Sequence, residues 1–125
     1  MDECAAQRRL LSEEFQSNRK VFLALGDETR QQILVALLEN EKIGMRVPEI
    51  TARTHLSRPA VSHHLQILKD AGLIQMHRAG TRNYYYVGAD GGCWRELKAL
   101  ADHVDRVVKS AAENAYPRLR EDERP

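Results

Sequence analysis

Basic, hydroxyl and amide side chains recur along residues 58–70, on the faces of a helix that its apolar residues leave free. Val61, Leu65 and Leu68 are spaced by four and three residues, as on one buried helical face. The other positions hold small, hydrogen-bonding or basic residues: Ser57, Arg58, Ala60, Ser62, His63, Gln66 and Lys69. Such a face suits insertion into the major groove of DNA, where base edges present donors and acceptors.

The distribution of charge agrees with double-stranded DNA as the partner of this helix. The net charge of the chain is only +1, but residues 46–86 carry six Lys or Arg against two Asp or Glu, while the remainder is net negative. We expect Arg58, Ser62 and His63 to contact base edges and nearby phosphates. The residues expected to serve mainly phosphates or outer bases are Ser57, Gln66 and Lys69. A basic face that is merely solvated is the alternative interpretation.

A shorter helix and a tight turn precede this helix and would position it. The pattern predicts a helix over about 47–54, a turn at His55-Leu56 and a second helix capped by Ser57, so that about 47–71 form a helix-turn-helix. One turn residue must take a positive φ, and His55 is the candidate because His tolerates that conformation better than most residues. A plain helical hairpin within a core is the alternative.

A β-hairpin is predicted directly after the second helix, over about 73–87. Leu73, Ile74 and Met76 lead into one strand, Gly80 suits the turn, and the returning strand is rich in Tyr and Val. The polar and basic residues near the hairpin tip are Arg78, Thr81, Arg82 and Asn83. A helix-turn-helix followed by a basic hairpin is a winged helix, whose wing would follow the phosphate backbone or enter the minor groove.

Three motifs in this order resemble the ArsR/SmtB family of winged-helix transcriptional repressors. They are LGDETRQQILVALL at 25–38, LSRPAVSHHLQILKDAGLI at 56–74 and HRAGTRNYYYV at 77–87. The resemblance implies a mainly α fold with a small β-hairpin wing, in the order α-α-α-α-β-β-α. It also implies a homodimer that binds a palindromic operator and usually represses. In the family pattern His64 packs and hydrogen-bonds locally, and a brief strand at about 43–45 pairs with the wing.

Residues 3 to about 25 are helical in pattern, with a possible break near Ser17-Asn18 and an end at Gly26. Asp27 is the expected cap of the next helix, whose buried stripe is Ile33, Leu34, Leu37 and Leu38. The resemblance implies that the N-terminal helix joins the dimer interface, through Leu11 and Phe15.

The final helix, about 93–115, has a heptad seam that predicts a dimer interface. Its seam positions are Trp94, Leu97, Ala101, Val104, Val108, Ala111 and Ala115. Leu100 and Val107 lie off the seam and are expected to face the subunit's own core. The alternative is a helix buried within one domain. We expect residues 1–116 to form a single domain and residues 117–125 to form a mobile charged tail.

The metal-binding motifs of many relatives are missing from this chain. Met45 to Pro48 stand where such relatives carry Cys-x-Cys, and Asp102 and His103 are adjacent, which is the wrong order and spacing for Asp-x-His. We therefore expect no metal site and no cofactor. His103 is expected to form a solvated surface pair with Asp102 or Asp105.

The two cysteines, Cys4 and Cys93, fall on the helices expected at the dimer interface. A dithiol pair could sense oxidants or reactive sulfur and change the spacing of the two wings. Two unremarkable thiols are the alternative, and the effector is unknown.

Length and composition restrict the remaining classes. The 125 residues suit one domain, and there is neither an apolar run of membrane-spanning length nor a secretory signal pattern, so we expect a cytoplasmic protein with no membrane partner. Catalytic motifs with a phosphate loop, or a nucleophile with its base, are missing, so an enzyme is not expected. The runner-up is a winged-helix protein-interaction module without specific DNA binding.

Overall fold

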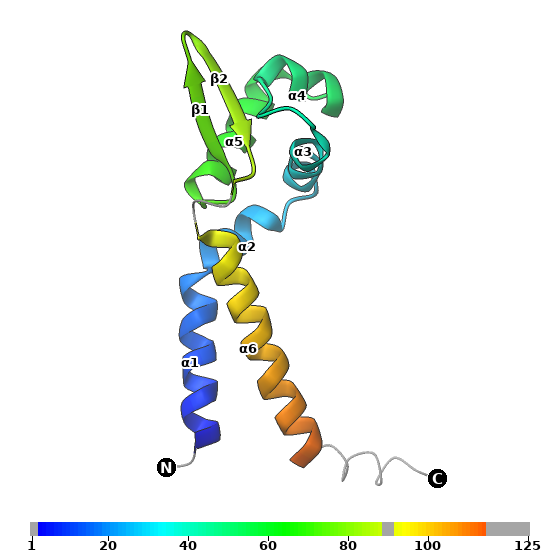
Figure 1. The fold of residues 1–125 in the computed structure, drawn as a ribbon. Helices are drawn as coiled ribbons and strands as arrows, with labels where there is room; N and C mark the ends of the chain where they lie inside the picture. The colour runs from blue at the N-terminus through cyan, green and yellow to red at the C-terminus, as the bar shows by residue number, and fades with distance from the viewer. Residues whose placement is uncertain (1–2, 89–91, 115–125) are drawn as a thin grey trace, which may run out of the picture. The chain divides into compact units, whose positions relative to one another are not determined.

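The computed structural model describes residues 3–88 and 92–114, except for the side chain of Cys4. Its elements are α1 (Glu3–Ser17), α2 (Arg19–Leu25), α3 (Glu28–Glu39), α4 (Val47–Thr54), α5 (Arg58–Asp70), β1 (Gln75–Ala79), β2 (Arg82–Tyr86) and α6 (Cys93–Asn114) (Figure 1). The chain divides into two compact units, residues 19–94 and residues 1–18 with 95–125. The predicted charged tail at 117–125 lies outside the described residues.

The core of the unit formed by residues 19–94 joins α3, α4, α5 and the segment that leads into the wing. Its largest fully buried side chains are Ile33, Ile50, Val61, Leu65, Leu68, Leu73 and Ile74. The predicted stripe of the second helix is therefore the face that α5 buries. Because the buried positions recur at helical spacing, the opposite face of α5 is left outside the core.

The turn between α4 and α5 has the predicted backbone. His55 takes φ 59°, in the left-handed region, and its N–H donates to the carbonyl of Thr51 at 2.9 Å. The Ser57 hydroxyl then accepts from the backbone N–H of Ala60 at 3.3 Å, and Pro59 lies in the first turn of α5. This C-cap and N-cap together set the direction of α5 relative to α4.

The wing is a two-stranded antiparallel sheet in which Arg78 pairs with Asn83 and Ala79 pairs with Arg82. Gly80 takes φ 64° in the turn, which glycine adopts without strain. Met45 adds an isolated bridge to Tyr85, with both N–H···O distances 2.8 Å. The expected pairing of residues 43–45 with the wing is thus confirmed at Met45.

The expected break in the N-terminal helical segment occurs at Asn18. The Asn18 side-chain amide donates to the carbonyl of Glu14 at 2.8 Å, and its backbone N–H lies 3.2 Å from the same oxygen. A side chain that bonds to the backbone in this way competes with continuation of the helix. The break adds one helix to the expected order, so five helices precede the wing in the part of the chain that the structure describes.

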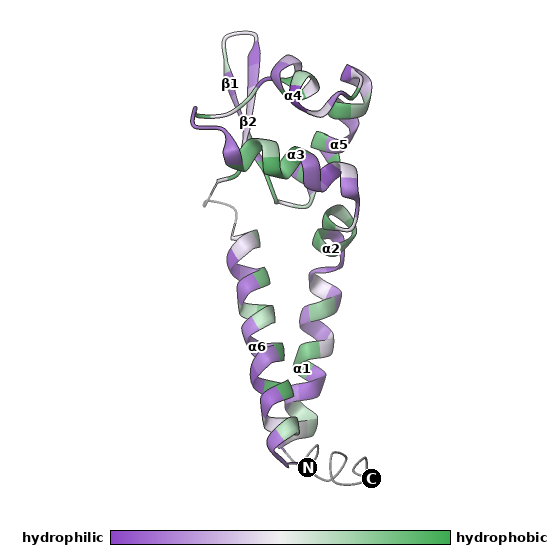
Figure 2. Ribbon diagram, turned by 90° about the vertical axis from the view of Figure 1, so that its right-hand side faces the viewer, coloured by the Kyte–Doolittle hydropathy of each residue, from purple (hydrophilic) through white to green (hydrophobic). Residues whose placement is uncertain are grey.

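In the unit that contains α1 and most of α6, Leu100 and His103 are buried. The prediction of a solvated His103 paired with Asp102 or Asp105 is wrong, because His103 is 8% exposed and its ring contacts Gln7 and Glu14 of α1. Figure 2 shows hydrophobic and hydrophilic residues mixed along both α1 and α6. Among the described residues, no helix has the length and apolarity needed to cross a membrane.

Candidate nucleic-acid interface

The predicted contact residues of α5 lie on its outer face. The exposed ones are Ser57, Arg58, Ser62, His63, Gln66 and Lys69, and Ala60 is half-buried. The Gln66 amide donates to the Asp70 carboxylate at 2.7 Å, four residues later. Gln66 would have to exchange this intrahelical partner for a DNA group, whereas the small Ala60 allows another surface to approach the helix.

The wing presents its polar residues at the tip. The exposed ones are Arg78, Thr81, Arg82 and Asn83. The Arg78 Nε donates to the carbonyl of Gly80 at 3.0 Å, which orients the guanidinium along the turn. The tip therefore carries two positive charges on a strand pair that Met45 ties to the rest of the unit.

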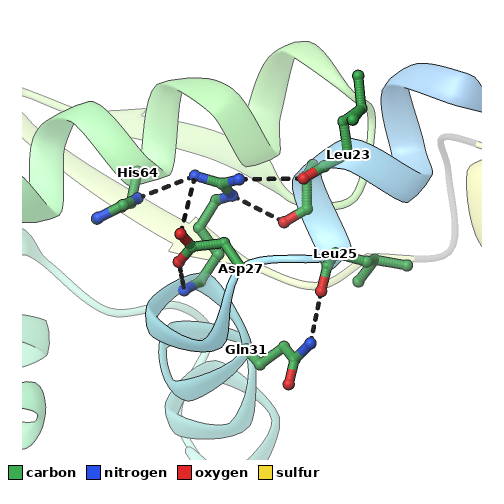
Figure 3. Close-up of polar contacts among 7 residues, drawn as sticks. Leu23, Leu25, Asp27, Gln31 and His64 are labelled. Atoms are coloured by element: carbon green, nitrogen blue, oxygen red, sulfur yellow. Dashed lines mark hydrogen bonds and ion pairs between the residues drawn. The ribbon is translucent and has the colours of Figure 1, made fainter.

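Arg30 is a residue behind this interface, in contact with α5, that the sequence interpretation missed (Figure 3). Its Nη2 donates to the carbonyl of Leu23 at 3.0 Å and its Nε to the carbonyl of Ala24 at 2.7 Å. The same guanidinium lies 3.3 Å from Nδ1 of His64 on α5, through Nη1. The partner of His64 is thus 34 residues away, and the expectation of a local hydrogen bond is wrong. The sequence signal that could have identified Arg30 is the Asp-x-x-Arg spacing at residues 27–30.

Asp27 supports Arg30 from the N-terminus of α3, as predicted for a cap. Its Oδ1 accepts from the Arg30 backbone N–H at 3.0 Å, and its Oδ2 lies 3.9 Å from Arg30 Nη1. The backbone hydrogen bond from Arg30 lowers the pKa of the Asp27 carboxyl below its ordinary value, and the Arg30 charge acts in the same direction. Asp27 therefore stays ionised and keeps the guanidinium in place near neutral pH.

The start of α6 packs against the segment that follows α5. The Trp94 indole N–H donates to the carbonyl of Leu73 at 3.0 Å, so the indole that was predicted for the dimer seam is also held within its own unit. Cys93 is buried, and its thiol lies 3.6 Å from the carbonyl of Ala71. The side chain of Cys4 lies outside the described part of the structure, so the approach of Cys4 to Cys93 stays a prediction.

The described residues include no group of three or more His, Cys, Asp or Glu side chains that could hold a metal ion. Most of the histidines have other partners. His64 contacts Arg30, His103 contacts Glu14 and Gln7, and His77 stacks at a tilt against Tyr84. What the described residues do provide is an exposed basic helix face beside a basic hairpin.

Comparison with known proteins finds related transcriptional regulators. Residues 27–76 match the family described as bacterial regulatory protein, arsR family. The chain is 40% identical over 95 residues to an HTH-type transcriptional regulator of Methanocaldococcus jannaschii, which covers 76% of this chain and 99% of that protein. It is 42% identical over 65 residues to the transcriptional repressor SdpR of Bacillus subtilis, which covers 52% of this chain and 69% of the repressor.

Solved structures show the same architecture. An ArsR-like transcriptional regulator from Rhodococcus sp. RHA1 matches with a TM-score of 0.61 at 26% identity, over 81% of this chain and 94% of that chain. The homodimeric winged helix-turn-helix DNA-binding domain of a possible ArsR-family regulator from Mycobacterium bovis matches with a TM-score of 0.55 at 28% identity, over 89% of this chain and 88% of that chain. This chain therefore belongs to the ArsR family of winged helix-turn-helix transcriptional regulators, which are DNA-binding proteins and not enzymes.

Proposed function

We propose that the protein is a homodimeric repressor that binds a palindromic operator, with α5 in the major groove and the wing on the backbone. The observation that carries the proposal is the exposed polar and basic face of α5, opposite a stripe that is fully buried. Arg58 is expected to read a base edge, and Lys69 and Arg82 are expected to neutralise phosphates.

A dimer is supported by apolar positions on α6 that the single chain leaves open. Val108 is 52% exposed and Ala101 is also exposed, although both belong to the heptad seam. The matching Mycobacterium bovis domain is homodimeric. Two-fold symmetry in the protein predicts two half-sites about one helical turn of DNA apart, which is why we propose a palindrome.

The test is selection of DNA from random sequence, followed by fluorescence anisotropy over a range of salt concentrations. A palindrome should be enriched, and its affinity should fall steeply with salt because phosphate contacts release counterions. Lys69→Gln should weaken binding and reduce the salt slope by about 1. Lys109→Gln, on an exposed face of α6, removes the same charge and should change neither.

Failure to enrich any sequence would overturn the proposal and favour a protein-interaction module. The same assay, run with reductant, with oxidant and with zinc, also tests whether the protein senses a signal. A signal that uses the pair of Cys4 and Cys93 has to react with the buried Cys93 thiol, so we expect such oxidation to change operator binding only slowly.

A further inference from the structure

The contact with Arg30 allows only one tautomer of the neutral His64 imidazole. A guanidinium has only donors, so the Nδ1 that lies 3.3 Å from Arg30 Nη1 must accept. Nδ1 is then unprotonated, and the neutral ring carries its proton on Nε2.

Arg30 is itself held firmly enough to impose this arrangement. Its side chain is 13% exposed, and two of its nitrogens donate to the carbonyls of Leu23 and Ala24 at the end of α2. The Asp27 carboxylate accepts from the Arg30 backbone N–H through Oδ1, and its Oδ2 lies 3.9 Å from Nη1. Rotating Arg30 away from His64 would break these bonds as well, so the tautomer is coupled to the packing of α2 against α3.

The protonated nitrogen of His64 faces away from Arg30. Figure 3 shows the second ring nitrogen at the far side of the ring from the guanidinium. Among the described residues no acceptor is hydrogen-bonded to this nitrogen, and the side chain is half-buried. His64 directly precedes the buried Leu65 and follows the exposed His63, so it lies on the flank of α5, between the core and the outer face.

We propose that Arg30 presets His64 as a neutral Nε2–H donor for a phosphate of the operator. This inference rests on the proposed DNA-binding function and adds a contact to it. A side chain on the flank of a groove-bound helix reaches the backbone more readily than base edges, which is why a phosphate is the partner. Arg30 acts as a positioning residue, because it touches His64 and not the DNA.

The tautomer can be tested in the free protein, by nitrogen-15 NMR of the imidazole. The expected spectrum has a protonated Nε2 and an unprotonated Nδ1 for His64. In Arg30→Met, which keeps an unbranched apolar stem and removes the guanidinium donors, the ring proton should distribute between both nitrogens. A proton on Nδ1 in the wild type, or an unchanged spectrum in Arg30→Met, would overturn the proposal.

The phosphate contact can be tested with two amides that replace His64. Gln places its terminal nitrogen near the position of Nε2, so His64→Gln keeps the outward donor, whereas Asn reaches only as far as Nδ1. We expect His64→Asn to lose about tenfold in operator affinity, evenly across operator variants, and His64→Gln to lose much less. The salt slope should not change, because a neutral donor releases no counterion.

Equal losses of operator affinity in the two variants, or a larger loss in His64→Gln, would contradict the phosphate contact. Thermal unfolding of each variant checks that a folding defect is not the cause. If the wild type selects no operator, the proposed function fails and the phosphate contact fails with it. The NMR result on the free protein is independent of DNA, and it separates failure of the tautomer from failure of the function.

Discussion

The imidazole of His103 on α6 lies between two side chains of α1, with its Nδ1 2.7 Å from Glu14 Oε1 and its Nε2 2.7 Å from Gln7 Oε1. Both ring nitrogens thus have partners, although the ring is buried. A buried polar group that loses its partner costs about 1–3 kcal/mol. This contact therefore ties the two helices of its unit together.

Replacing Glu14 should destabilise the protein through this contact. We expect Glu14→Ala to lower the free energy of unfolding in urea by about 1–3 kcal/mol, because Nδ1 of His103 would be left without its acceptor. Asp105→Ala is the matched control, since Asp105 is exposed and pairs with Lys109 at 3.0 Å. Equal losses in the two variants would show that His103 does not depend on Glu14.

The left-handed turn at His55 gives opposite expectations for two substitutions. This conformation costs an L-residue about 1–2 kcal/mol, and the entropy of a glycine in the unfolded chain costs about 0.5–1 kcal/mol. His55→Gly should therefore be as stable as the wild type or slightly more stable, by about 0.5 kcal/mol. His55→Val should lose at least about 1 kcal/mol, because a β-branched residue resists positive φ. Chemical denaturation that ranks Val above Gly would contradict this view of the turn.

Arg58 provides the sharpest test of base recognition. If its guanidinium contacts a guanine in the major groove, Arg58→Ala should cost about 1–3 kcal/mol in operator binding and relax specificity at one position. Repeating the selection with the variant measures both effects. Arg106→Ala, an exposed arginine of α6, is the control. An unchanged sequence preference in Arg58→Ala would remove Arg58 from the base-reading residues.

The heptad seam of α6 predicts where a charge should separate subunits. Val108→Glu should convert the dimer to monomer, because a carboxylate in an apolar interface loses its hydration without a partner. Sedimentation equilibrium measures the change in mass. Ser110→Glu introduces the same charge off the seam and should leave the dimer intact. A dimeric Val108→Glu protein would require a different interface.

Acid should remove part of the stability that Asp27 provides. Hydrogen bonding from the Arg30 backbone N–H lowers its pKa below 3.8, so the ionised carboxylate favours the folded state. The contribution is complete above the unfolded pKa and is lost as the pH falls through the lower, folded pKa. Asp27→Asn keeps a capping oxygen but cannot titrate. Its deficit in melting temperature relative to the wild type should therefore shrink between about pH 7 and pH 2.5.

The elements of the candidate interface could be predicted from the sequence because their signals are local. The stripe of Val61, Leu65 and Leu68 identifies the buried face of α5, and the cap at Ser57 marks its start. The positive φ of His55 follows from the short turn between two helices. Each of these features depends on residues within a few positions, where helical geometry and capping preferences already restrict the backbone.

Polar partners far apart in the sequence were decided only by the tertiary structure. Arg30 and His64 are 34 residues apart, and His103 and Glu14 are 89 residues apart. A histidine can bond to any donor or acceptor that packing brings near, so its neighbours along the chain do not identify its partner. Sequence therefore determined the winged helix-turn-helix and its exposed basic face. Packing between helices determined that His103 of α6 is buried and that Nδ1 of His64 lies against Arg30.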